Sequence, residues 1–226
     1  MSPRADEAQR SGAEPEEIEL KLAVGAPAMV RAIIEDPPAD GIGGFRPAGP
    51  VRRVRCIDRY VDTAPLDGAL RRSGLRARLR ERDGQTILTV KASLRREGDV
   101  GRRVELEAPA TADLDPAAWP ASRARSRLVA VLGDGRLVEI AALRQRRLQR
   151  DFARGTTTVE MSLDEMAALH GRRVLARRVE VEAELLAGDP ALLHDLAAAL
   201  GRLPGIGPAS ESKLAFALGS RSLPAR

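Results

Sequence analysis

Charged and apolar residues alternate one by one in several short segments of this chain. Residues 17–21 read EIELK, residues 75–80 read LRARLR, residues 103–107 read RVELE and residues 180–184 read EVEAE. Successive side chains of a β-strand point to opposite faces, so each segment is expected to be a strand with one apolar and one charged face. Strands of this kind constrain the chain to a mainly antiparallel β-fold.

The charged faces are sorted by sign from strand to strand. Glutamates cluster in three of these segments, whereas arginines cluster at residues 75–80 and again at residues 144–146. A single charged face most often points to water, but solvated faces are expected to mix Lys, Glu, Thr and Gln. Clustered carboxylates suit a hard divalent cation such as Mg²⁺ or Mn²⁺, and clustered arginines suit phosphate. If both sets face one enclosed channel, they form a metal–phosphate site.

Eight strands are expected, at about residues 16–22, 54–61, 74–82, 86–92, 103–107, 143–152, 156–163 and 174–186. Asp83-Gly84 between two of them is a strong hairpin turn signal. Helices are expected at residues 27–35 and 122–132, from an N-cap at Asp189 to a C-cap at Gly201, and after a cap at Ser210. Eight is the number of strands at which a sheet can close into a small barrel. The predicted fold is therefore α+β, an eight-stranded closed antiparallel β-barrel with a few peripheral helices.

Composition is consistent with one domain in a reducing compartment. The chain has 226 residues, of which 43% are hydrophobic, and we expect a single domain at 16–219 between disordered tails at 1–15 and 220–226. There is no apolar run long enough to span a membrane and no secretory signal at the start. Cys56 is the only cysteine, so no internal disulfide can form. We expect a cytoplasmic protein.

The basic character of the chain points to an anionic partner. Its net charge is +5, and most of the positive charge comes from arginine, whose planar fork of donors suits phosphate. Aromatic residues make up only 2% of the chain, which disfavours nucleic acid because readers of single strands stack bases on aromatic rings. A small phosphorylated molecule is the favoured partner. The oligomeric state is open, with a homodimer as one alternative.

In their order along the chain, these blocks resemble the CYTH superfamily, the triphosphate tunnel metalloenzymes. Residues 17–21 match the ExExK signature, and the family's other blocks follow at residues 60–63, 75–78, 89–91, 103–107, 144–146, 160–164, 180–184 and 212–213. The resemblance covers about residues 16–218 and is greatest to bacterial members related to inorganic triphosphatases. It implies the same tunnel-shaped barrel.

The resemblance also implies roles for individual residues. The triphosphate is expected to bind basic side chains from several strands and the last helix: Lys21, Arg76, Arg78, Lys91, Arg103, Arg144, Arg146 and Lys213. A divalent metal, Mg²⁺ or Mn²⁺, is expected to bind the glutamates Glu17, Glu19, Glu160, Glu180 and Glu182. Glu105 and Glu107 are expected to support a second metal or the attacking water, with Lys21 beside them as a catalytic residue.

Some positions stay undecided or are expected to be inactive. The family often has an acidic residue shortly after Glu160, and Ser162 and Asp164 compete for that position. Glu184 is expected at the mouth of the channel without a chemical role. Tyr60 and Asp62 are expected to be structural.

The implied activity is metal-dependent hydrolysis of a triphosphate, most readily inorganic triphosphate, to release orthophosphate. Thiamine triphosphate and a nucleoside triphosphate are alternative substrates. A class IV adenylate cyclase, which makes cyclic AMP and pyrophosphate from ATP, is an alternative within the family. A non-catalytic module that binds polyphosphate or RNA through its arginines is an alternative of another class.

Overall fold

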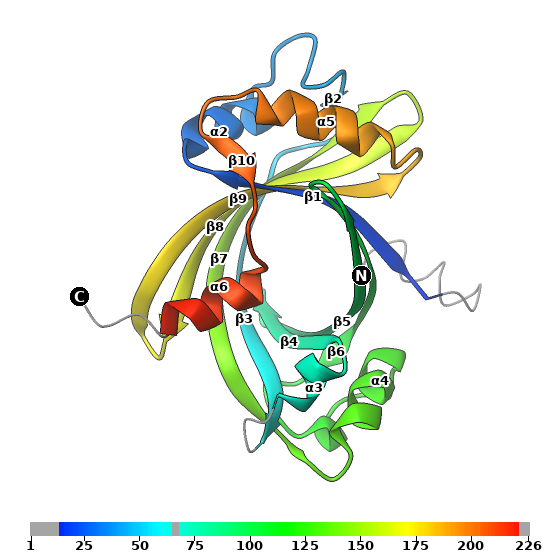
Figure 1. Ribbon diagram of the computed structural model, residues 1–226, viewed down its shortest axis with the longest axis vertical. Helices are drawn as coiled ribbons and strands as arrows, with labels where there is room; N and C mark the ends of the chain where they lie inside the picture. The colour runs from blue at the N-terminus through cyan, green and yellow to red at the C-terminus, as the bar shows by residue number, and fades with distance from the viewer. Residues whose placement is uncertain (1–13, 65–67, 222–226) are drawn as a thin grey trace.

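Eight antiparallel strands close into a barrel around an open channel (Figure 1). The computed structural model describes residues 14–64 and 68–221, so most of the expected tail at 1–15 and residues 222–226 of the other expected tail lie outside the described residues. Neighbouring strands follow the order β1-β6-β5-β4-β3-β7-β8-β9, and β9 pairs back with β1. The predicted closed barrel is confirmed.

The strands of the wall vary in length. They are β1 (Glu16–Val24), β3 (Arg52–Ala64), β4 (Leu75–Arg82), β5 (Gln85–Glu97), β6 (Val100–Ala110), β7 (Arg136–Arg154), β8 (Thr157–His170) and β9 (Arg173–Ala187). Two short strands pair with single strands of the wall: β2 (Arg46–Pro47) pairs with β7, and β10 (Ile206–Pro208) pairs with β1. The helical segments are α2 (Pro27–Glu35), α3 (Ala69–Arg72), the 3-10 turn Pro116–Ala118, α4 (Arg123–Leu132), α5 (Leu192–Gly201) and α6 (Lys213–Arg221).

The apolar faces of the strands point out of the barrel, where helices cover them. One core lies over β1, β7, β8 and β9, beneath α2 and α5 at the top of Figure 1; Leu20, Leu163 and Val181 of this core are fully or almost fully buried. A second core lies over β4, β5 and β6, beneath α3 and α4. Since strand side chains alternate between faces, the charged faces of the same strands must point into the channel.

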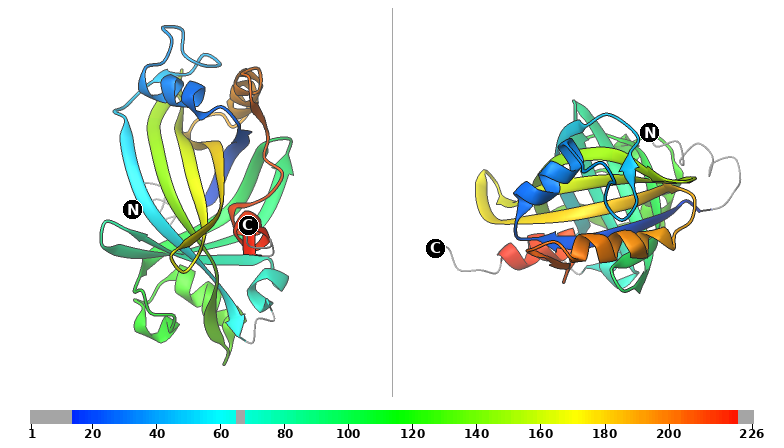
Figure 2. Two further views of the ribbon diagram at one scale, coloured as in Figure 1. Left: turned by 90° about the vertical axis from the view of Figure 1, so that its left-hand side faces the viewer. Right: turned by 90° about the horizontal axis from the view of Figure 1, so that it is seen from above.

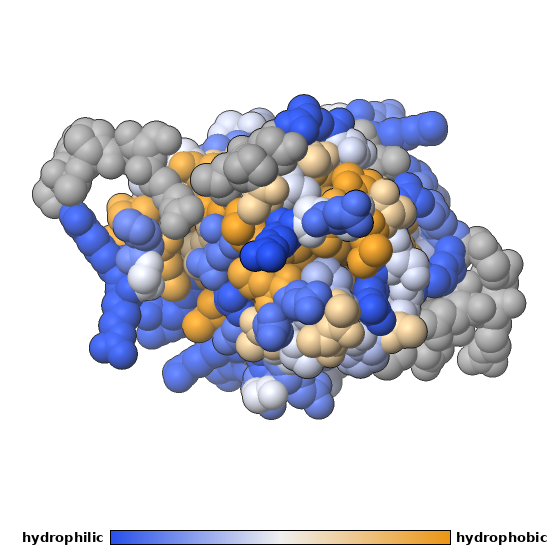
Figure 3. Space-filling model, turned by 90° about the horizontal axis from the view of Figure 1, so that it is seen from below, coloured by the Kyte–Doolittle hydropathy of each residue, from blue (hydrophilic) through white to orange (hydrophobic). Residues whose placement is uncertain are grey.

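Helix α6 closes part of one mouth of the barrel. It lies at the left margin of the opening in Figure 1, and its Leu214 and Phe216 pack in a third core with Tyr60, Leu143 and Met166. At the lower end, the face seen from below shows hydrophobic and charged residues interleaved (Figure 3). Val129 of α4 is one of the large hydrophobic residues that remain exposed, at 38%. Within the described residues, the helices are too short or too polar to cross a membrane.

Several local predictions agree with the structure. Helix α2 has the predicted bounds, and the Ser122 hydroxyl caps α4 by accepting a hydrogen bond of 3.1 Å from the Arg125 N–H. Asp83 and Gly84 both have positive φ, 51° and 75°, as a tight two-residue hairpin turn requires.

Three predicted caps are wrong. The hydroxyl that caps α6 belongs to Ser212, which accepts a hydrogen bond from the Ala215 N–H at 3.1 Å, and not to Ser210. Asp189 accepts a bond from the Ala191 N–H, but α5 begins later, at Leu192. Gly201 is the last residue of α5 and does not follow it.

Candidate functional site

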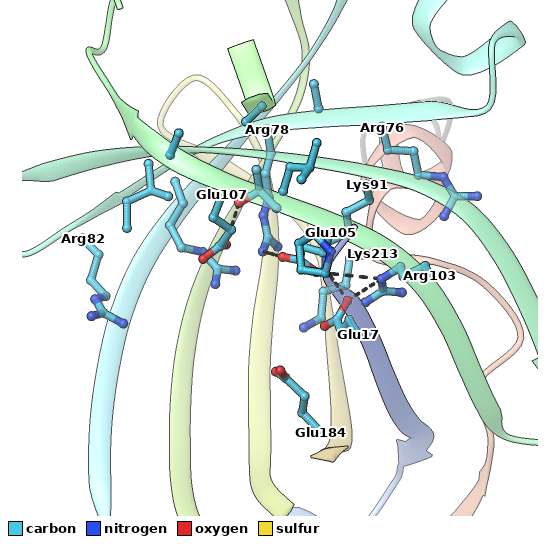
Figure 4. Close-up of a pocket in the computed structure, with 18 of the residues that line it drawn as sticks. Glu17, Arg76, Arg78, Arg82, Lys91, Arg103, Glu105, Glu107, Glu184 and Lys213 are labelled. Carbon is cyan, nitrogen blue, oxygen red and sulfur yellow. Dashed lines mark hydrogen bonds and ion pairs between the residues drawn. The ribbon is translucent and has the colours of Figure 1, made fainter. Parts of the chain in front are cut away.

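The channel of the barrel is a cavity of about 1380 Å³ lined by charged side chains (Figure 4). All the wall strands and α6 contribute to the lining. It includes most of the predicted site residues: Glu17, Glu19, Lys21, Arg76, Arg78, Lys91, Arg103, Glu105, Glu107, Glu160, Glu182 and Lys213. The structure thus brings acidic and basic strand faces together in one enclosed space.

Carboxylates of β1 pair with cations from β5 and β6. Arg103 Nε lies 2.5 Å from Glu17 Oε2, and Arg103 Nη1 lies 2.8 Å from Glu19 Oε1. Lys91 Nζ lies 3.2 Å from the same oxygen of Glu17 and 2.5 Å from Glu105 Oε2. Burial alone would lower the pKa of Arg103, but Glu19 and Glu17 raise it, so the guanidinium stays charged.

Glu182 on β9 stands at the centre of a second network. Lys21 Nζ approaches one of its oxygens at 2.8 Å, while Lys213 Nζ at 2.9 Å and Arg147 Nη2 at 3.2 Å approach the other. Burial would raise the pKa of Glu182, but these three cations hold it well below the usual range. Lys213 and Arg147 Nε also contact Asp164, which is fully buried.

A third network holds two arginines of β4. Asp58 of β3 is fully buried and accepts a hydrogen bond of 2.9 Å from Arg78 Nη1 and bonds of 2.7 and 2.8 Å from Arg80 Nε and Nη2. The Gln145 amide donates to the same carboxylate. Burial would raise the pKa of Asp58, yet Arg78 and Arg80 hold it far below its usual range.

The glutamates of β6 differ in their partners. The pKa of Glu105 falls to about 2, since Lys91, Glu17 and Arg78 outweigh the effect of burial. Glu107 accepts a hydrogen bond of 2.9 Å from the Thr89 hydroxyl. Both residues point into the cavity from the same strand (Figure 4).

Glu184 is the lumen carboxylate whose charge is least compensated. It stands apart from the interactions drawn in Figure 4 and has no ion-pair or hydrogen-bond partner among the described residues. Burial, followed by the neighbouring carboxylates of Glu17 and Glu105, raises its pKa to about 8. Glu184 thus lines the cavity near Glu17 and Glu105, and its expected lack of a chemical role stays a prediction.

Three predicted site residues do not line the cavity. Arg144 and Arg146 are exposed on the outer face of β7, so their assignment to triphosphate binding is wrong. Glu180 points inward but is fully buried behind the lining, with Arg178 Nη2 2.8 Å and Lys21 Nζ 4.0 Å from its oxygens. It is therefore not poised as a ligand in the cavity.

Other lumen residues were missed by sequence reasoning. Arg147 takes the position predicted for its neighbours, and Arg80 continues the charged face of β4. Asp58, behind the lining, supports Arg78 and Arg80. Arg80 could have been found, since it shares the alternation of the other β4 arginines. After Glu160, the buried Asp164 carboxylate pairs with Arg147 and Lys213, while the Ser162 hydroxyl lines the cavity and accepts a hydrogen bond of 3.1 Å from Arg147 Nη2.

Comparison with known proteins agrees with this geometry. The CYTH domain family matches residues 15–216. This chain belongs to the CYTH domain family. No curated protein sequence matches the chain significantly.

Solved structures of other proteins share the fold of this CYTH protein. One of them is HpAC1 from Hippeastrum, which is presumed to be an adenylyl cyclase and is described as having a dominant triphosphatase activity. It is 21% identical to this chain, with a TM-score of 0.67, and the match covers 92% of this chain and 98% of that chain. A presumed adenylate cyclase from Bacillus halodurans is 17% identical, with 88% and 96% covered and a TM-score of 0.60. The PH1819 protein from Pyrococcus horikoshii OT3 is 19% identical, with 91% and 99% covered and a TM-score of 0.53.

The CYTH superfamily is metal-dependent, and the lumen carboxylates of this CYTH protein provide the oxygen donors that a hard divalent cation prefers. In the part of the chain that the structure describes, no three acidic, histidine or cysteine side chains are arranged to hold a metal as they stand. Most of these carboxylates are paired with Lys or Arg instead. A cation beside Glu184 would offset its repulsion with Glu17 and Glu105. The donor set therefore fits a divalent metal by its chemistry, and loading requires some ion pairs to open.

Proposed function

We propose that this CYTH protein hydrolyses a triphosphate, with inorganic triphosphate as the first candidate, and releases orthophosphate. The observation that carries the proposal is the convergence of Lys and Arg side chains with several glutamates in one enclosed cavity. Charged strand faces that served only to contact solvent would lie on the outside of the barrel, and would not bring acidic and basic side chains together in a channel. The triphosphatase activity described for HpAC1, which has the same fold, supports the proposal.

The basic side chains bind and orient the substrate in this proposal. Arg78 is held by Asp58 and therefore presents its guanidinium in a fixed direction, while Arg76 lines the cavity without an ion-pair partner in the described chain. Lys21 of β1 and Lys213 of α6 both line the cavity and meet at Glu182, at 2.8 and 2.9 Å from its two oxygens. Fixing a triphosphate in line with the attacking water can lower a barrier by roughly 7–11 kcal/mol.

The acidic side chains hold the metal and the water. The proposed ligands that line the cavity are Glu17, Glu19, Glu160 and Glu182, and Glu184 joins them. A bound Mg²⁺ or Mn²⁺ would offset charge on the phosphate oxygens in the transition state. Glu105 stays ionised at neutral pH and can accept a hydrogen bond from the attacking water.

The reaction proceeds by attack of water on the terminal phosphorus. The new P–O bond forms as the anhydride bond to the middle phosphate breaks, which gives orthophosphate and pyrophosphate. Lys21 and Arg103 can stabilise charge on the departing pyrophosphate, since both keep their positive charge inside the cavity. We propose the cytoplasm as the compartment, in keeping with the single free Cys56.

Phosphate release from triphosphate and from ATP, each with Mg²⁺ and with Mn²⁺, tests the proposal. We expect the wild type to release phosphate from triphosphate only with a metal, and Glu17→Gln and Lys21→Ala to lose most of this activity while they keep the fold. Arg127→Gln, on the exposed face of α4, is the matched control and should retain it. Wild-type rates in both lumen variants would refute the assignment, and cyclic AMP formed from ATP would replace hydrolysis with cyclase activity.

A further inference from the structure

Four arginines lie on the outer face of the barrel wall formed by β3, β7, β8 and β9. Arg55 of β3 stands directly opposite Arg146 of β7, and Arg144 of β7 is two residues away on the same face. Arg177 of β9 lies in the same row as Arg144, with only Ala167 of β8 between them. We call this set, Arg55, Arg144, Arg146 and Arg177, the outer arginine face.

The outer arginine face holds more arginines than acidic residues: Glu165 of β8 stands directly opposite Arg146, and the arginines have no other acidic cross-strand partner in the described sheet. All four side chains are exposed, and none of them has an ion-pair partner within the described chain. The carboxylates nearby are already engaged: Glu35 with Arg53 at 2.6 Å and Glu165 with Arg31. Four arginines therefore share this face with one carboxylate that Arg31 already engages, and positive charge is in excess.

Repulsion between these arginines lowers the stability of the fold when no partner is bound. Like charges directly opposite each other on adjacent strands destabilise a sheet by a fraction of a kcal/mol up to about 1 kcal/mol. Elsewhere on the same two strands an arginine has a carboxylate partner: Arg59 Nε lies 2.9 Å from Glu139 Oε2. The described elements leave this part of the sheet uncovered, below α2 and α5 in the left view of Figure 2. An anionic partner can therefore reach it.

The chemistry of the face favours a phosphate polymer that has no bases. Arginine forks bind phosphate oxygens in pairs. Readers of single-stranded nucleic acid add aromatic rings on which bases stack. All the aromatic residues of this chain are described and buried: Phe45, Tyr60, Trp119, Phe152 and Phe216. The face thus offers charge without any stacking surface.

We propose that the outer arginine face binds inorganic polyphosphate, at a site separate from the channel. The wall of the barrel lies between the two sites, because the side chains of β7 that line the channel alternate with Arg144 and Arg146. The inference does not depend on the proposed triphosphatase activity.

The test measures binding of fluorescently labelled long-chain polyphosphate by anisotropy across a series of salt concentrations. A chelator is present, so that metal-dependent hydrolysis is blocked, and the channel residues are the same in all the proteins compared. The variant R55Q/R144Q/R146Q is compared with R46Q/R102Q/R127Q, which removes the same charge from exposed arginines on three separate elements, β2, β6 and α4.

We expect the outer-face variant to bind roughly tenfold more weakly or worse, and the slope of log affinity against log salt to fall by about 2, since each phosphate contact contributes about 0.7–0.9. The dispersed control should keep the wild-type affinity and slope. The thermal midpoint of the outer-face variant should equal or exceed that of the wild type, because repulsion is removed. This measurement separates loss of binding from loss of folding.

If both variants bound polyphosphate more weakly than the wild type and to the same extent, the proposal would be overturned, because the net charge of the protein would then explain the binding. Tighter wild-type binding to single-stranded RNA, duplex DNA or anionic lipid vesicles than to polyphosphate would also overturn it, and would assign the face to that other partner.

Discussion

Asp58 and Asp164 are two fully buried aspartates that lie behind the lining of the channel. Each accepts hydrogen bonds from two cations that do line it: Arg78 and Arg80 for Asp58, Arg147 and Lys213 for Asp164. Because the lining cations come from different strands, the aspartates fix their positions relative to one another. In the proposed mechanism, each aspartate would act on the substrate only through the cations that it orients.

The pKa of Asp58 gives a stability prediction. Arg78 and Arg80 hold this pKa below the usual value near 3.9, so the carboxylate stabilises the fold fully above that pH and its contribution is lost as pH falls towards the folded-state pKa. We expect Asp58→Asn to lower the free energy of unfolding at pH 7 by about 3–5 kcal/mol, as breaking a buried ion pair does.

Urea unfolding of both proteins at pH 7 and at pH 3 checks the prediction for Asp58. The difference between wild type and Asp58→Asn should narrow at pH 3, because the wild type has begun to lose its charge contribution while the variant has none to lose. If the free energies of unfolding of the two proteins differ by the same amount at both pH values, the Asp58 carboxylate contributes by shape and packing alone.

Strand β7 shows which part of the site could be predicted from sequence and which could not. The alternation of charge and apolar residues is enough to locate the eight strands and to predict the barrel. It does not say which face of β7 points inward, because arginines occupy both faces between residues 144 and 150. The apolar residues decide it. Leu148 and Phe152 are buried in the outer core, so the residues in phase with them, including Arg144 and Arg146, also point outward.

Two neighbouring arginines of β7 therefore give a matched pair of variants. We expect Arg147→Gln to reduce triphosphatase activity strongly, since this side chain lines the channel and bonds to Asp164 at 2.7 Å. Arg146→Gln should leave the rate unchanged, because its side chain lies outside the barrel. Kinetics with triphosphate and a saturating divalent metal make the comparison. If Arg146→Gln lowered the rate strongly and Arg147→Gln did not, Arg146 would face the channel, as the resemblance to the family implied, and the orientation of β7 in this structure would be wrong.

The ends of the helices could also be predicted only in part from the sequence. The expected helix at 122–132 begins at the residue that caps α4, Ser122, whereas Ser210 and Ser212 both precede α6 and only Ser212 caps it. Lys213, the first residue of α6, is anchored to Asp164 and Glu182, and this fixes where the helix can begin. Helix ends that are set by long-range contacts are not encoded in neighbouring residues.

At the scale of the whole molecule, the barrel has its apolar faces outside and its charged faces inside. The interior is stable without ligands because the cations of some strands neutralise the carboxylates of others. Lys21 with Glu182 and Arg103 with Glu17 are examples, with distances of 2.8 and 2.5 Å. Burial of unpaired charges would cost several kcal/mol each, and pairing avoids this cost. The same pairing means that each ligand must compete with a charge of the protein.

This competition predicts that metal and triphosphate bind cooperatively. A phosphate that draws Lys21 away from Glu182 leaves a carboxylate free for the metal, and a metal on Glu182 leaves Lys21 free for phosphate. Coupling of this kind is reciprocal and typically amounts to 5–150-fold in affinity. Calorimetric titration of Mn²⁺ should therefore show binding at least about fivefold tighter with a non-hydrolysable triphosphate analogue than without it. Lys21→Met should bind Mn²⁺ alone more tightly than the wild type and show less coupling, since one competing cation is gone. If Mn²⁺ binds the wild type equally well with and without the analogue, the lumen ion pairs do not oppose loading, and the metal must bind carboxylates that are already free, such as Glu184.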